Sequence, residues 1–446
     1  MSGNTRRSAV VIGSGISGLT AGFRLHRRGY DVTVLERGPA VGGKMSSIRR
    51  DGFTINRAAN ILPSSYSTIR SLIGELNLSG QISDIPGILA IPRGGQLHRI
   101  RSTGVSMLKD ALHTNLFTRH SKLKARNLLI DGLRMKRYLS YENLGAAAKF
   151  DSQTAAQYCD RRLTPELEEF LVNPLLRALY CAESHDVSVV DFFFAAVNFV
   201  GSGFMSYPSG IGFLVEAIAR QLNVVTNAEA TNVTERGDDV VVTYAVDGAE
   251  SALTADACVI ATPATEVPQL FPQLDAAQRE ILCHRIEYGT AYAAHFAVSR
   301  KPDEDAMVIP VPTPVDRGLC VVVLPHNFSR GAAPDGKGIV STYWLGSWCD
   351  DHSDNADADL VAEMLPSIEK VLPGISRDVE FSHIERWRPA VVRSYPGMYS
   401  HVDDFVSRVD PRSRVQLAGD YMSASSTNGC ATSAEVAAQR VIRVVG

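Results

Sequence analysis

The chain has 446 residues, enough for two or three structural units and a large hydrophobic core. Its 45 Lys and Arg against 48 Asp and Glu give a formal net charge of −3, so the protein carries no overall positive field for a phosphate backbone. Nucleic acid is therefore not expected as a partner. Hydrophobic residues make up 45% and charged residues 21% of the chain, which is typical of a folded globular protein and excludes a disordered or fibrous one.

Cysteine usage and hydropathy indicate the compartment. The seven cysteines contain no C-x-x-C pair and no spacing typical of metal ligands, so we expect reduced thiols and no metal site. The apolar run after Arg6 and Arg7 is shorter than the core of a signal peptide, and no apolar stretch reaches the length of a membrane span. These features predict a cytoplasmic protein.

A strand, a glycine-rich turn, a helix and a second strand follow one another near the N-terminus. The four parts are Ala9–Ile12, Gly13-Ser14-Gly15-Ile16-Ser17-Gly18, Leu19–Arg28 and Asp31–Glu36. Gly13 permits the tight turn, Gly15 lets a pyrophosphate approach the backbone, and Gly18 allows the helix to pack closely on the strand. The helix N-terminus then faces the phosphates, and the carboxylate of Glu36 accepts hydrogen bonds from both ribose hydroxyls. Because all four parts are present, we expect the whole turn to bind a dinucleotide.

A pair of glycines after the second strand indicates which dinucleotide binds. Glu36-Arg37 is followed by Gly42-Gly43-Lys44, which suits a backbone that passes close to a second stretch of phosphate or ribityl chain. This extension favours FAD over NAD, the alternative being an ordinary glycine loop. The chain has no second G-x-G-x-x-G between a strand and a helix, so we expect no separate NADPH domain. Electrons should leave to dioxygen, a quinone or a carrier protein.

The end of the chain repeats the pattern of strand, turn and helix. Arg414–Ala418 predicts a short strand, Gly419-Asp420 ends it, and Ser425–Gly429 leads into a helix over Cys430–Val444. The carboxylate of Asp420 is suited to accept a hydrogen bond from a ribityl hydroxyl. The positive end of the helix dipole is suited to stabilise negative charge on a reduced flavin ring. Asp420 and Asn428 as plain turn and cap residues are the alternative.

The segments between these motifs predict a split domain. Short strand-like runs of the same kind occur in residues 1–75, 206–265 and 411–446, so we expect these three segments to form one FAD-binding domain. Residues 76–205 and 266–410 are then inserted between its parts. The first excursion is helical, and the second holds strand-like runs from Tyr288 to Leu324. We therefore expect an α/β fold in which a Rossmann-type FAD domain is interleaved with an α+β substrate domain of antiparallel sheet and helices.

Taken together, these segments resemble the FAD-dependent superfamily of protoporphyrinogen oxidases, phytoene-type carotenoid desaturases and flavin amine oxidases. The resemblance covers nearly the whole chain, from the first glycine-rich turn to Leu417–Asp420 and Gly429. Asn173–Tyr180 with Ser188, and Arg386–Ala390 with Tyr395–Gly397, are similar to the protoporphyrinogen-oxidase-like branch.

The sequence departs from the superfamily pattern at several positions. Ala293 stands where amine oxidases typically carry a lysine near flavin N5, which lowers the expectation of amine oxidation. Asn56 and Ala58 replace an acid and a glycine in the segment that ends at Asn60, so the packing of this segment on the flavin is expected to differ. The resemblance also implies cofactor contacts for three further residues, which are Ala230 at the adenine, Thr427 and Asn428. Covalent attachment of FAD through Cys430 is an alternative to the non-covalent binding that we expect.

The resemblance implies an FAD-dependent oxidoreductase that desaturates a hydrophobic, cyclic small molecule by hydride transfer to flavin N5. A flavin amine oxidase that oxidises a C–N bond is the first alternative, and a non-redox flavoprotein or isomerase is the second. No acid or base is assigned. Tyr292, His295 and Tyr395 are candidates for catalysis, and Trp387 and Tyr395 are candidates for an aromatic wall of the substrate pocket. Core packing is the alternative for each.

Residues 119–137 combine seven Lys or Arg with regularly spaced apolar residues and one acid, Asp131. This pattern predicts a cationic amphipathic helix. We expect a solvated helix face in the inserted domain, and the alternative is a peripheral contact with anionic lipid. The sequence leaves a homo-oligomer open.

Overall fold

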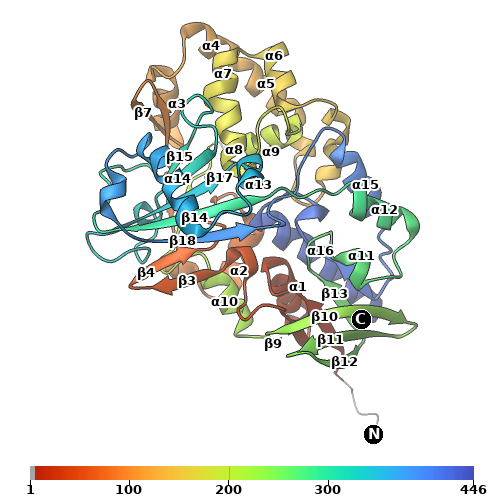
Figure 1. The fold of residues 1–446 in the computed structure, drawn as a ribbon. Helices are drawn as coiled ribbons and strands as arrows, with labels where there is room; N and C mark the ends of the chain where they lie inside the picture. The colour runs from red at the N-terminus through yellow and green to blue at the C-terminus, as the bar shows by residue number, and fades with distance from the viewer. Residues whose placement is uncertain (1–5, 200) are drawn as a thin grey trace.

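The computed structural model describes residues 6–199 and 201–446 (Figure 1). Its first layer is a parallel sheet of five strands in the order β19-β13-β1-β2-β9. The strands are β1 (Ser8–Ile12), β2 (Asp31–Leu35), β9 (Asn223–Val225), β13 (Ala257–Ile260) and β19 (Val415–Leu417). They come from the beginning, middle and end of the chain, so strands distant in sequence share one sheet.

Both faces of this sheet are covered, which explains why its strands are continuous apolar runs. Ala9 and Val11 of β1 pack with the two long helices α1 (Ile16–Arg27) and α16 (Thr427–Val445). Val10 and Ile12 face the other way, toward an antiparallel sheet of β10 (Ala228–Arg236), β11 (Asp239–Val246) and β12 (Ala249–Ala255). Figure 1 shows α1 and α16 side by side, as their packing in one apolar cluster requires.

Arg24 joins the two ends of the chain. Its guanidinium on α1 binds Glu435 on α16 at 2.6 Å and Glu75 of α2 (Ser67–Glu75) at 2.5 Å. All three side chains are at most about one-third exposed, with Arg24 at 18%. Charged hydrogen bonds of this kind are among the stronger ones in proteins. They hold the final helix against the first.

The second large layer is a seven-stranded sheet in the order β18-β14-β17-β16-β15-β6-β7. Its strands are β6 (Ile88–Arg93), β7 (Gln96–Arg101), β14 (Ala291–Val298), β15 (Val308–Pro310), β16 (Leu319–Val323), β17 (Gly338–Trp344) and β18 (Val379–Trp387). Neighbours pair antiparallel except β6 and β15, which are parallel. One face of β14 packs on α14 (Asp357–Glu369) through apolar side chains.

Helices fill the first excursion between β7 and the return to the parallel sheet. They are α3 (Gly104–His113), α4 (Arg119–Lys124), α5 (Arg126–Met135), α6 (Ala155–Arg162), α7 (Pro165–Leu167), α8 (Asn173–Tyr180) and α9 (Val189–Phe199). The remaining helices are α10 (Phe213–Ala219), α11 (Val267–Leu270), α12 (Ala276–His284), α13 (Gly346–Asp351) and α15 (Met398–Arg408). The remaining strands form two small ribbons, β3 (Ser47–Arg50) with β4 (Phe53–Asn56) and β5 (Ser83–Ile85) with β8 (Phe204–Ser206).

These layers confirm the predicted fold class, a Rossmann-type α/β domain interleaved with an antiparallel sheet and helices. The exact boundaries of the five predicted segments stay predictions. The single helix predicted over 119–137 is wrong: α4 and α5 are separate helices that meet at Ala125, and a short 3-10 turn follows at Lys136–Tyr138. Within the ranges that the structure describes, no helix combines the length and the apolar character needed to cross a bilayer.

Candidate functional site

The glycine-rich turn at the end of β1 has one open side. Gly13 has a φ of +97°, and a Cβ added there would lie 2.9 Å from the carbonyl oxygen of Ala261. A Cβ on Gly18 would lie 1.8 Å from the carbonyl oxygen of Gly13, so α1 packs directly on the turn. A Cβ on Gly15 would meet no atom within 4 Å. The backbone at Gly15, at the N-terminus of α1, is therefore free to approach a phosphate, as the prediction requires.

The second glycine pair lies beside this turn. The backbone amide of Gly42 donates to the carbonyl oxygen of Ser14 at 2.9 Å, and Gly42 and Gly15 form an isolated parallel bridge. Gly42 and Gly43 both have positive φ, at +103° and +51°. Two glycine-rich loops thus border the same crevice, which fits the phosphates of a dinucleotide.

Glu36 follows β2, and its carboxylate is held over the turn. Oε2 accepts hydrogen bonds from the backbone amide and hydroxyl of Ser14 at 2.8 and 2.6 Å, and Oε1 accepts from the amide of Gly38 at 2.7 Å. The carbonyl oxygen of Glu36 also accepts from the amide of Ala228, which brings β10 and Ala230 close to this corner. Arg37 is instead 60% exposed and forms an ion pair with Glu266 at 2.8 Å.

Three residues from distant segments meet where the glycine loop, β14 and β19 converge. Lys44 donates to the carbonyl oxygen of Ala390, and its ammonium lies 5.9 Å from the centre of the Tyr288 ring. The Tyr288 hydroxyl donates to Asp420 at 2.7 Å. Burial and the Asp420 charge raise the pKa of Tyr288 well above its ordinary value, so its hydroxyl stays a donor. The sequence interpretation named Lys44 and Asp420 but missed Tyr288, which no motif distinguishes from a core tyrosine.

The two predicted residues at the start of α16 have different environments. The Thr427 hydroxyl is buried and has no hydrogen-bond partner within the described part of the chain, which fits a polar group of the cofactor. Asn428 is fully buried, and its Oδ1 accepts from the backbone amides of Thr68 and Ile69 at 3.0 and 3.2 Å. Asn428 therefore caps α2 through Oδ1, whereas its buried Nδ2 has no hydrogen-bond partner among the described residues. The predicted contact of Asn428 with FAD stays a prediction.

Asn60 lies in a buried amide network. Its Oδ1 accepts from Asn56 at 2.7 Å, and its Nδ2 donates to the hydroxyl of Tyr343 on β17. Asn56 in turn accepts from the hydroxyl of Ser47 and the amide of Ile211 at 2.8 and 2.9 Å. Where the superfamily has an acid, this chain thus uses an amide that both donates and accepts. The predicted contact of Asn60 with FAD stays a prediction.

The catalytic candidates Tyr292 and His295 lie on opposite faces of β14, because three residues along a strand reverse the side chain. Tyr292 packs in the apolar cluster against α14, with its ring centre 6.5 Å from that of Trp348. His295 is fully buried and shares a 2.8 Å hydrogen bond with the Ser341 hydroxyl. Burial and the neighbouring His383 lower the pKa of His295 to about 4, so it is neutral at physiological pH. The two candidates therefore face opposite sides of the sheet, and a catalytic role of either stays a prediction.

The face of β14 that carries Ala293 holds an ion pair. Glu385 of β18 lies directly across from Ala293 and binds the Arg57 guanidinium at 2.5 and 2.8 Å. Although burial alone would raise it, hydrogen bonds from His383 and Arg57 lower the pKa of Glu385 to about 2. This pair occupies the face on which an amine oxidase would carry its lysine. Arg57 stands between Asn56 and Ala58, the two positions that depart from the superfamily pattern, and no motif distinguishes it.

Trp387 borders the same face, whereas Tyr395 does not share its cluster. The Trp387 indole donates to the carbonyl oxygen of Arg57 at 3.2 Å and packs near Ala291. Tyr395 packs in the main core, and its hydroxyl donates to the carbonyl oxygen of Arg285 at 2.8 Å. The two residues thus pack in different apolar clusters, and the predicted aromatic wall stays a prediction.

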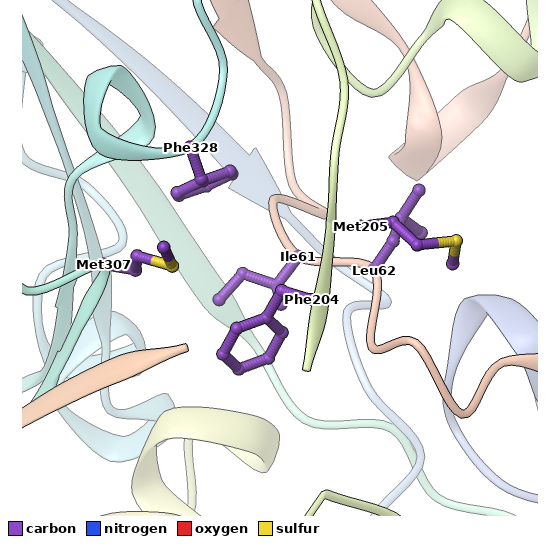
Figure 2. A pocket seen from close by; sticks show the side chains of 6 residues that line it. All are labelled: Ile61, Leu62, Phe204, Met205, Met307 and Phe328. Carbon is purple, nitrogen blue, oxygen red and sulfur yellow. The ribbon is translucent and has the colours of Figure 1, made fainter. Parts of the chain in front are cut away.

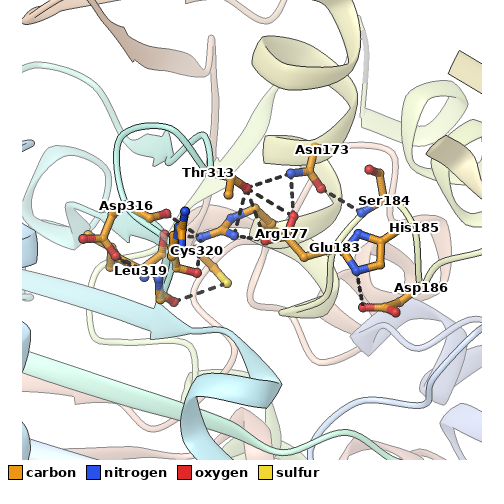
Figure 3. A network of polar contacts seen from close by, with 12 residues as sticks. Asn173, Arg177, Glu183, Ser184, His185, Asp186, Thr313, Asp316, Leu319 and Cys320 are labelled. Carbon is orange, nitrogen blue, oxygen red and sulfur yellow. Dashed lines mark hydrogen bonds and ion pairs between the residues drawn. The ribbon is translucent and has the colours of Figure 1, made fainter. Parts of the chain in front are cut away.

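A buried polar network explains the segment Asn173–Tyr180 (Figure 3). Arg177 on α8 is fully buried and binds Glu183 and the hydroxyl of Thr313. It also donates to the carbonyl oxygens of Asp316 and Leu319, both at 2.9 Å. Figure 3 shows the guanidinium reaching from the helix to the loop between β15 and β16. The segment thus fixes the helical insertion to the seven-stranded sheet.

A small apolar hollow lies in the cluster of side chains that joins α1 and α10 to β15 and β16 of the seven-stranded sheet (Figure 2). Its lining consists of Ile61, Leu62, Phe204, Met205, Met307 and Phe328. Figure 2 shows Phe204 and Ile61 facing Met307 and Phe328. The free space between these side chains sums to about 180 Å³, but none of it admits a water-sized sphere. The hollow is a packing gap of the core. Over residues 6–199 and 201–446, no group of three or more His, Cys, Asp or Glu is placed to hold a metal ion.

Two adjoining glycine loops, with a carboxylate at the end of the second strand, define a dinucleotide-binding fold. Residues 16–442 match the model of the family described as flavin containing amine oxidoreductase, and the chain belongs to this family. It is accordingly an FAD-dependent oxidoreductase.

Proteins similar to this chain include porphyrinogen oxidases and an amine oxidase. Coproporphyrinogen III oxidase of Bacillus subtilis (strain 168) is 21% identical over 450 residues, covering 88% of this chain and 93% of that protein. A structure from Exiguobacterium sp. 255-15, whose name assigns it provisionally to the protoporphyrinogen oxidases, has a TM-score of 0.75 at 20% identity and covers 97% of this chain and 98% of its own. Cyclohexylamine oxidase from Brevibacterium oxydans IH-35A has a TM-score of 0.74 at 17% identity and covers 98% of this chain and 99% of its own. The likeness to the two structures shows the shared fold.

Proposed function

We propose that this oxidoreductase desaturates a hydrophobic, cyclic small molecule, and that porphyrinogens are its substrate class. When bound, FAD supplies at N5 an acceptor for a hydride from carbon. The match to coproporphyrinogen III oxidase over most of both chains supports the class. The segments Asn173–Tyr180 and Arg386–Ala390, similar to the protoporphyrinogen-oxidase-like branch, point the same way.

The sheet face around Ala293 is the observation that carries the proposal. On β14, Ala293 stands at the position where amine oxidases carry a lysine, and Glu385, the carboxylate opposite it, is already bound by Arg57. A protonated amine would find no free anion there. The indole of Trp387 stacks under the Arg57 guanidinium at 5.2 Å and offers a flat apolar border. Such a face suits a neutral ring better than an ammonium ion.

An anaerobic screen tests the proposal. Purified holoenzyme is mixed with a reduced porphyrinogen or with cyclohexylamine, and the visible absorbance band of the flavin is followed. We expect the porphyrinogen to bleach the band and the amine to leave it unchanged. Bleaching by the amine alone would establish the amine oxidase alternative, which the shared fold with cyclohexylamine oxidase favours. If neither compound bleaches the flavin and turnover needs no acceptor, the protein is an isomerase or a non-redox flavoprotein.

The electron acceptor is part of the same proposal. Dioxygen, a quinone and a carrier protein are the three routes by which the reduced enzyme is reoxidised. Stopped-flow mixing of substrate-reduced enzyme with oxygenated buffer or with a soluble quinone separates the first two. Slow recovery of the flavin band with both would support a carrier protein.

We also propose that FAD binds without a covalent bond. Burial raises the pKa of Cys430 to about 12, so its sulfur is a neutral thiol and a poor nucleophile. Acid precipitation should therefore release all of the flavin into the supernatant, and Cys430→Ala should keep its FAD. Flavin that stays with the precipitate of the wild type but not of the variant would contradict non-covalent binding.

The cofactor residues are tested by a matched pair of glycines. Gly15→Ala adds a methyl group in open space, so the protein should fold normally but retain much less FAD if a phosphate passes there. Gly80→Ala also adds a methyl group in open space, away from the crevice, and should retain full FAD. Glu36→Ala should likewise lose FAD because the ribose hydroxyls lose their acceptor. Full flavin occupancy in Gly15→Ala would contradict the assignment.

A further inference from the structure

Two buried cysteines from distant parts of the chain lie beside each other. Cys181 follows the last residue of α8, and Cys320 lies on β16. Both belong to one small apolar cluster with Ala291 and Ala390, in which Cys181 is 8% exposed and Cys320 is 0% exposed. The Cys320 thiol lies within hydrogen-bonding reach of the Cys181 thiol, and neither forms a disulfide. The proposed function uses neither thiol.

Backbone hydrogen bonds hold both cysteines against the same two residues, Leu345 and Gly346, which follow β17. The carbonyl oxygen of Cys181 accepts from the amide of Gly346 at 3.0 Å. The amide of Leu345 donates to the carbonyl oxygen of Gly318 at 2.9 Å, two residues before Cys320. The main chain therefore fixes the two cysteines beside each other, although one belongs to the helical insertion and the other to the seven-stranded sheet.

Both cysteines have unusual backbone positions. Cys181 has a φ of +51°, in the left-handed region that residues other than glycine rarely adopt. The pairing of β16 with β17 shifts its register between Leu319 and Val321, so Cys320 is the additional residue of a β-bulge. A bulge redirects a side chain, and a left-handed residue persists only where its surroundings fix it. The two features together direct one thiol toward the other.

A buried cation lies close to this pair. Arg177 on α8 donates to the carbonyl oxygen of Leu319, and Figure 3 shows its guanidinium near Cys320, where its charge favours the thiolate. Burial and the neighbouring Cys181 thiol nevertheless raise the pKa of Cys320 well above its ordinary value. Cys320 is therefore a neutral thiol that water does not reach. Cys181, the more exposed of the two, is the thiol that meets a dissolved oxidant first.

We infer that Cys181 and Cys320 form a reversible disulfide when the enzyme meets hydrogen peroxide. The thiolate of Cys181 attacks one peroxide oxygen, the O–O bond breaks, and the departing hydroxide takes up the thiol proton, which gives water and a sulfenic acid. The sulfur of Cys320 then attacks the sulfur of Cys181, and the Cys320 proton leaves with the hydroxide as a second water. The two thiols thus lose two electrons, which peroxide takes up, and a dissolved dithiol reverses the reaction by exchange.

This inference goes beyond the proposed function, because it concerns two thiols and its test needs no substrate. A third cysteine, Cys349, is the alternative partner of Cys320. Its sulfur accepts from the amide of Tyr292 at 3.2 Å, and it packs in the apolar cluster against α14 and not in that of Cys181 and Cys320. We therefore expect Cys349 to stay a thiol.

Peptide mass spectrometry of the holoenzyme tests the inference. The protein is treated with dilute hydrogen peroxide, alkylated while it is denatured, and digested without reductant. We expect one pair of peptides joined through Cys181 and Cys320, which a dithiol separates again. Cys258, which is also 0% exposed, is the buried control and should be found alkylated. Cys283, the exposed cysteine, reports whether peroxide oxidises a single accessible thiol under the same conditions.

Two matched variants assign the order of the steps. In Cys320→Ser, Cys181 should stop at the sulfenic acid, which dimedone labels, because no second thiol resolves it. In Cys181→Ser, Cys320 should stay a thiol because peroxide does not reach it. Flavin content and far-ultraviolet circular dichroism report whether each variant folds, and the wild-type peptide map decides the inference even if a variant does not. A wild type that forms no joined peptides with peroxide, or that joins Cys320 to Cys349, would overturn the inference.

Discussion

Asp191 on α9 is a buried carboxyl group without a cation beside it. It is 3% exposed, and its Oδ1 accepts a hydrogen bond from the Tyr399 hydroxyl of α15 at 2.7 Å. Its Oδ2 has no hydrogen-bond partner among the residues described. The groups around it are Tyr399, Tyr180 of α8, Ser394 and the second acid Asp151. Burial raises the pKa of Asp191 to about 7, despite the hydrogen bonds from Ser394 and Tyr399.

This shift makes Asp191 a source of pH-dependent instability. In the unfolded chain its pKa takes the ordinary value of 3.8, so between that pH and about 7 the folded state binds more protons than the unfolded state. Stability therefore falls as the pH rises through this window and stops falling above it. The pKa difference corresponds to roughly 4 kcal/mol at alkaline pH, and roughly 2.5 kcal/mol of this is lost between pH 5 and pH 8.5.

Asp191→Asn removes the titration and keeps the shape. The amide oxygen still accepts from Tyr399, and the amide group carries no charge at any pH. At pH 5 we expect the free energy of unfolding of the variant to be equal to or lower than that of the wild type. Between pH 5 and pH 8.5 the difference should shift in favour of the variant by about 2 to 3 kcal/mol. Urea unfolding of both proteins across this pH range measures the difference. His295 and His326, whose pKa values are lowered to about 4, act in both proteins and cancel in the comparison.

Two results would refute this reasoning. Parallel stability curves for wild type and variant would mean that Asp191 does not titrate in this range in the folded protein. If the stability of the variant relative to the wild type decreases as the pH rises, the carboxylate of Asp191 is stabilised in its charged form. A control at the exposed acid Asp359, as Asp359→Asn, should leave the pH dependence unchanged.

Three further substitutions probe the contacts that hold the site together, each measured by urea unfolding. Arg177→Met should cost about 3 to 5 kcal/mol because it leaves Glu183 buried and unpaired, and adding Glu183→Gln should recover part of the loss. Asn428→Ala should cost about 1 to 2 kcal/mol by removing the cap of α2, and an unchanged stability would contradict that role. Arg24→Ala should cost about 2 kcal/mol by detaching α16 from α1 and α2, with Arg28→Ala, at the exposed residue that follows α1, as the neutral control.

The parts of the fold that the sequence predicts are those whose signal is local. The glycine spacing after β1 sets a turn, a helix start and a strand within 36 residues, and the structure has all of them. β13 and β19 are likewise short apolar runs followed by turn residues. The last helix begins at Thr427, three residues before the predicted start, because the Ser426 hydroxyl caps it by accepting from the Gly429 amide. That cap was readable from the sequence.

The contacts that the sequence does not predict join distant segments. Asn428 reaches residues about 360 positions away, and Arg57 reaches Glu385 across 328 positions. Neither partner can be chosen until the packing of two separate layers is known. The opposite directions of Tyr292 and His295 are a different case. A three-residue spacing in a strand already places them on opposite faces, so this feature could be predicted from the sequence.

The Arg57–Glu385 ion pair and Asn56 bear on one question, which is how a fold shared with amine oxidases would serve the substrate class that we propose. Arg57 forms an ion pair with Glu385, which lies opposite Ala293, the position of the lysine in amine oxidases. The carboxylate is therefore not free to bind a substrate ammonium ion. Asn56 replaces an acid in the same segment and binds through neutral hydrogen bonds. The ion pair leaves no free charge on the carboxylate opposite Ala293, and Asn56 leaves no charge at its position on β4. If the substrate binds beside this face, as the proposed function requires, the lack of a free anion lowers the affinity for an ammonium ion far more than for a neutral ring.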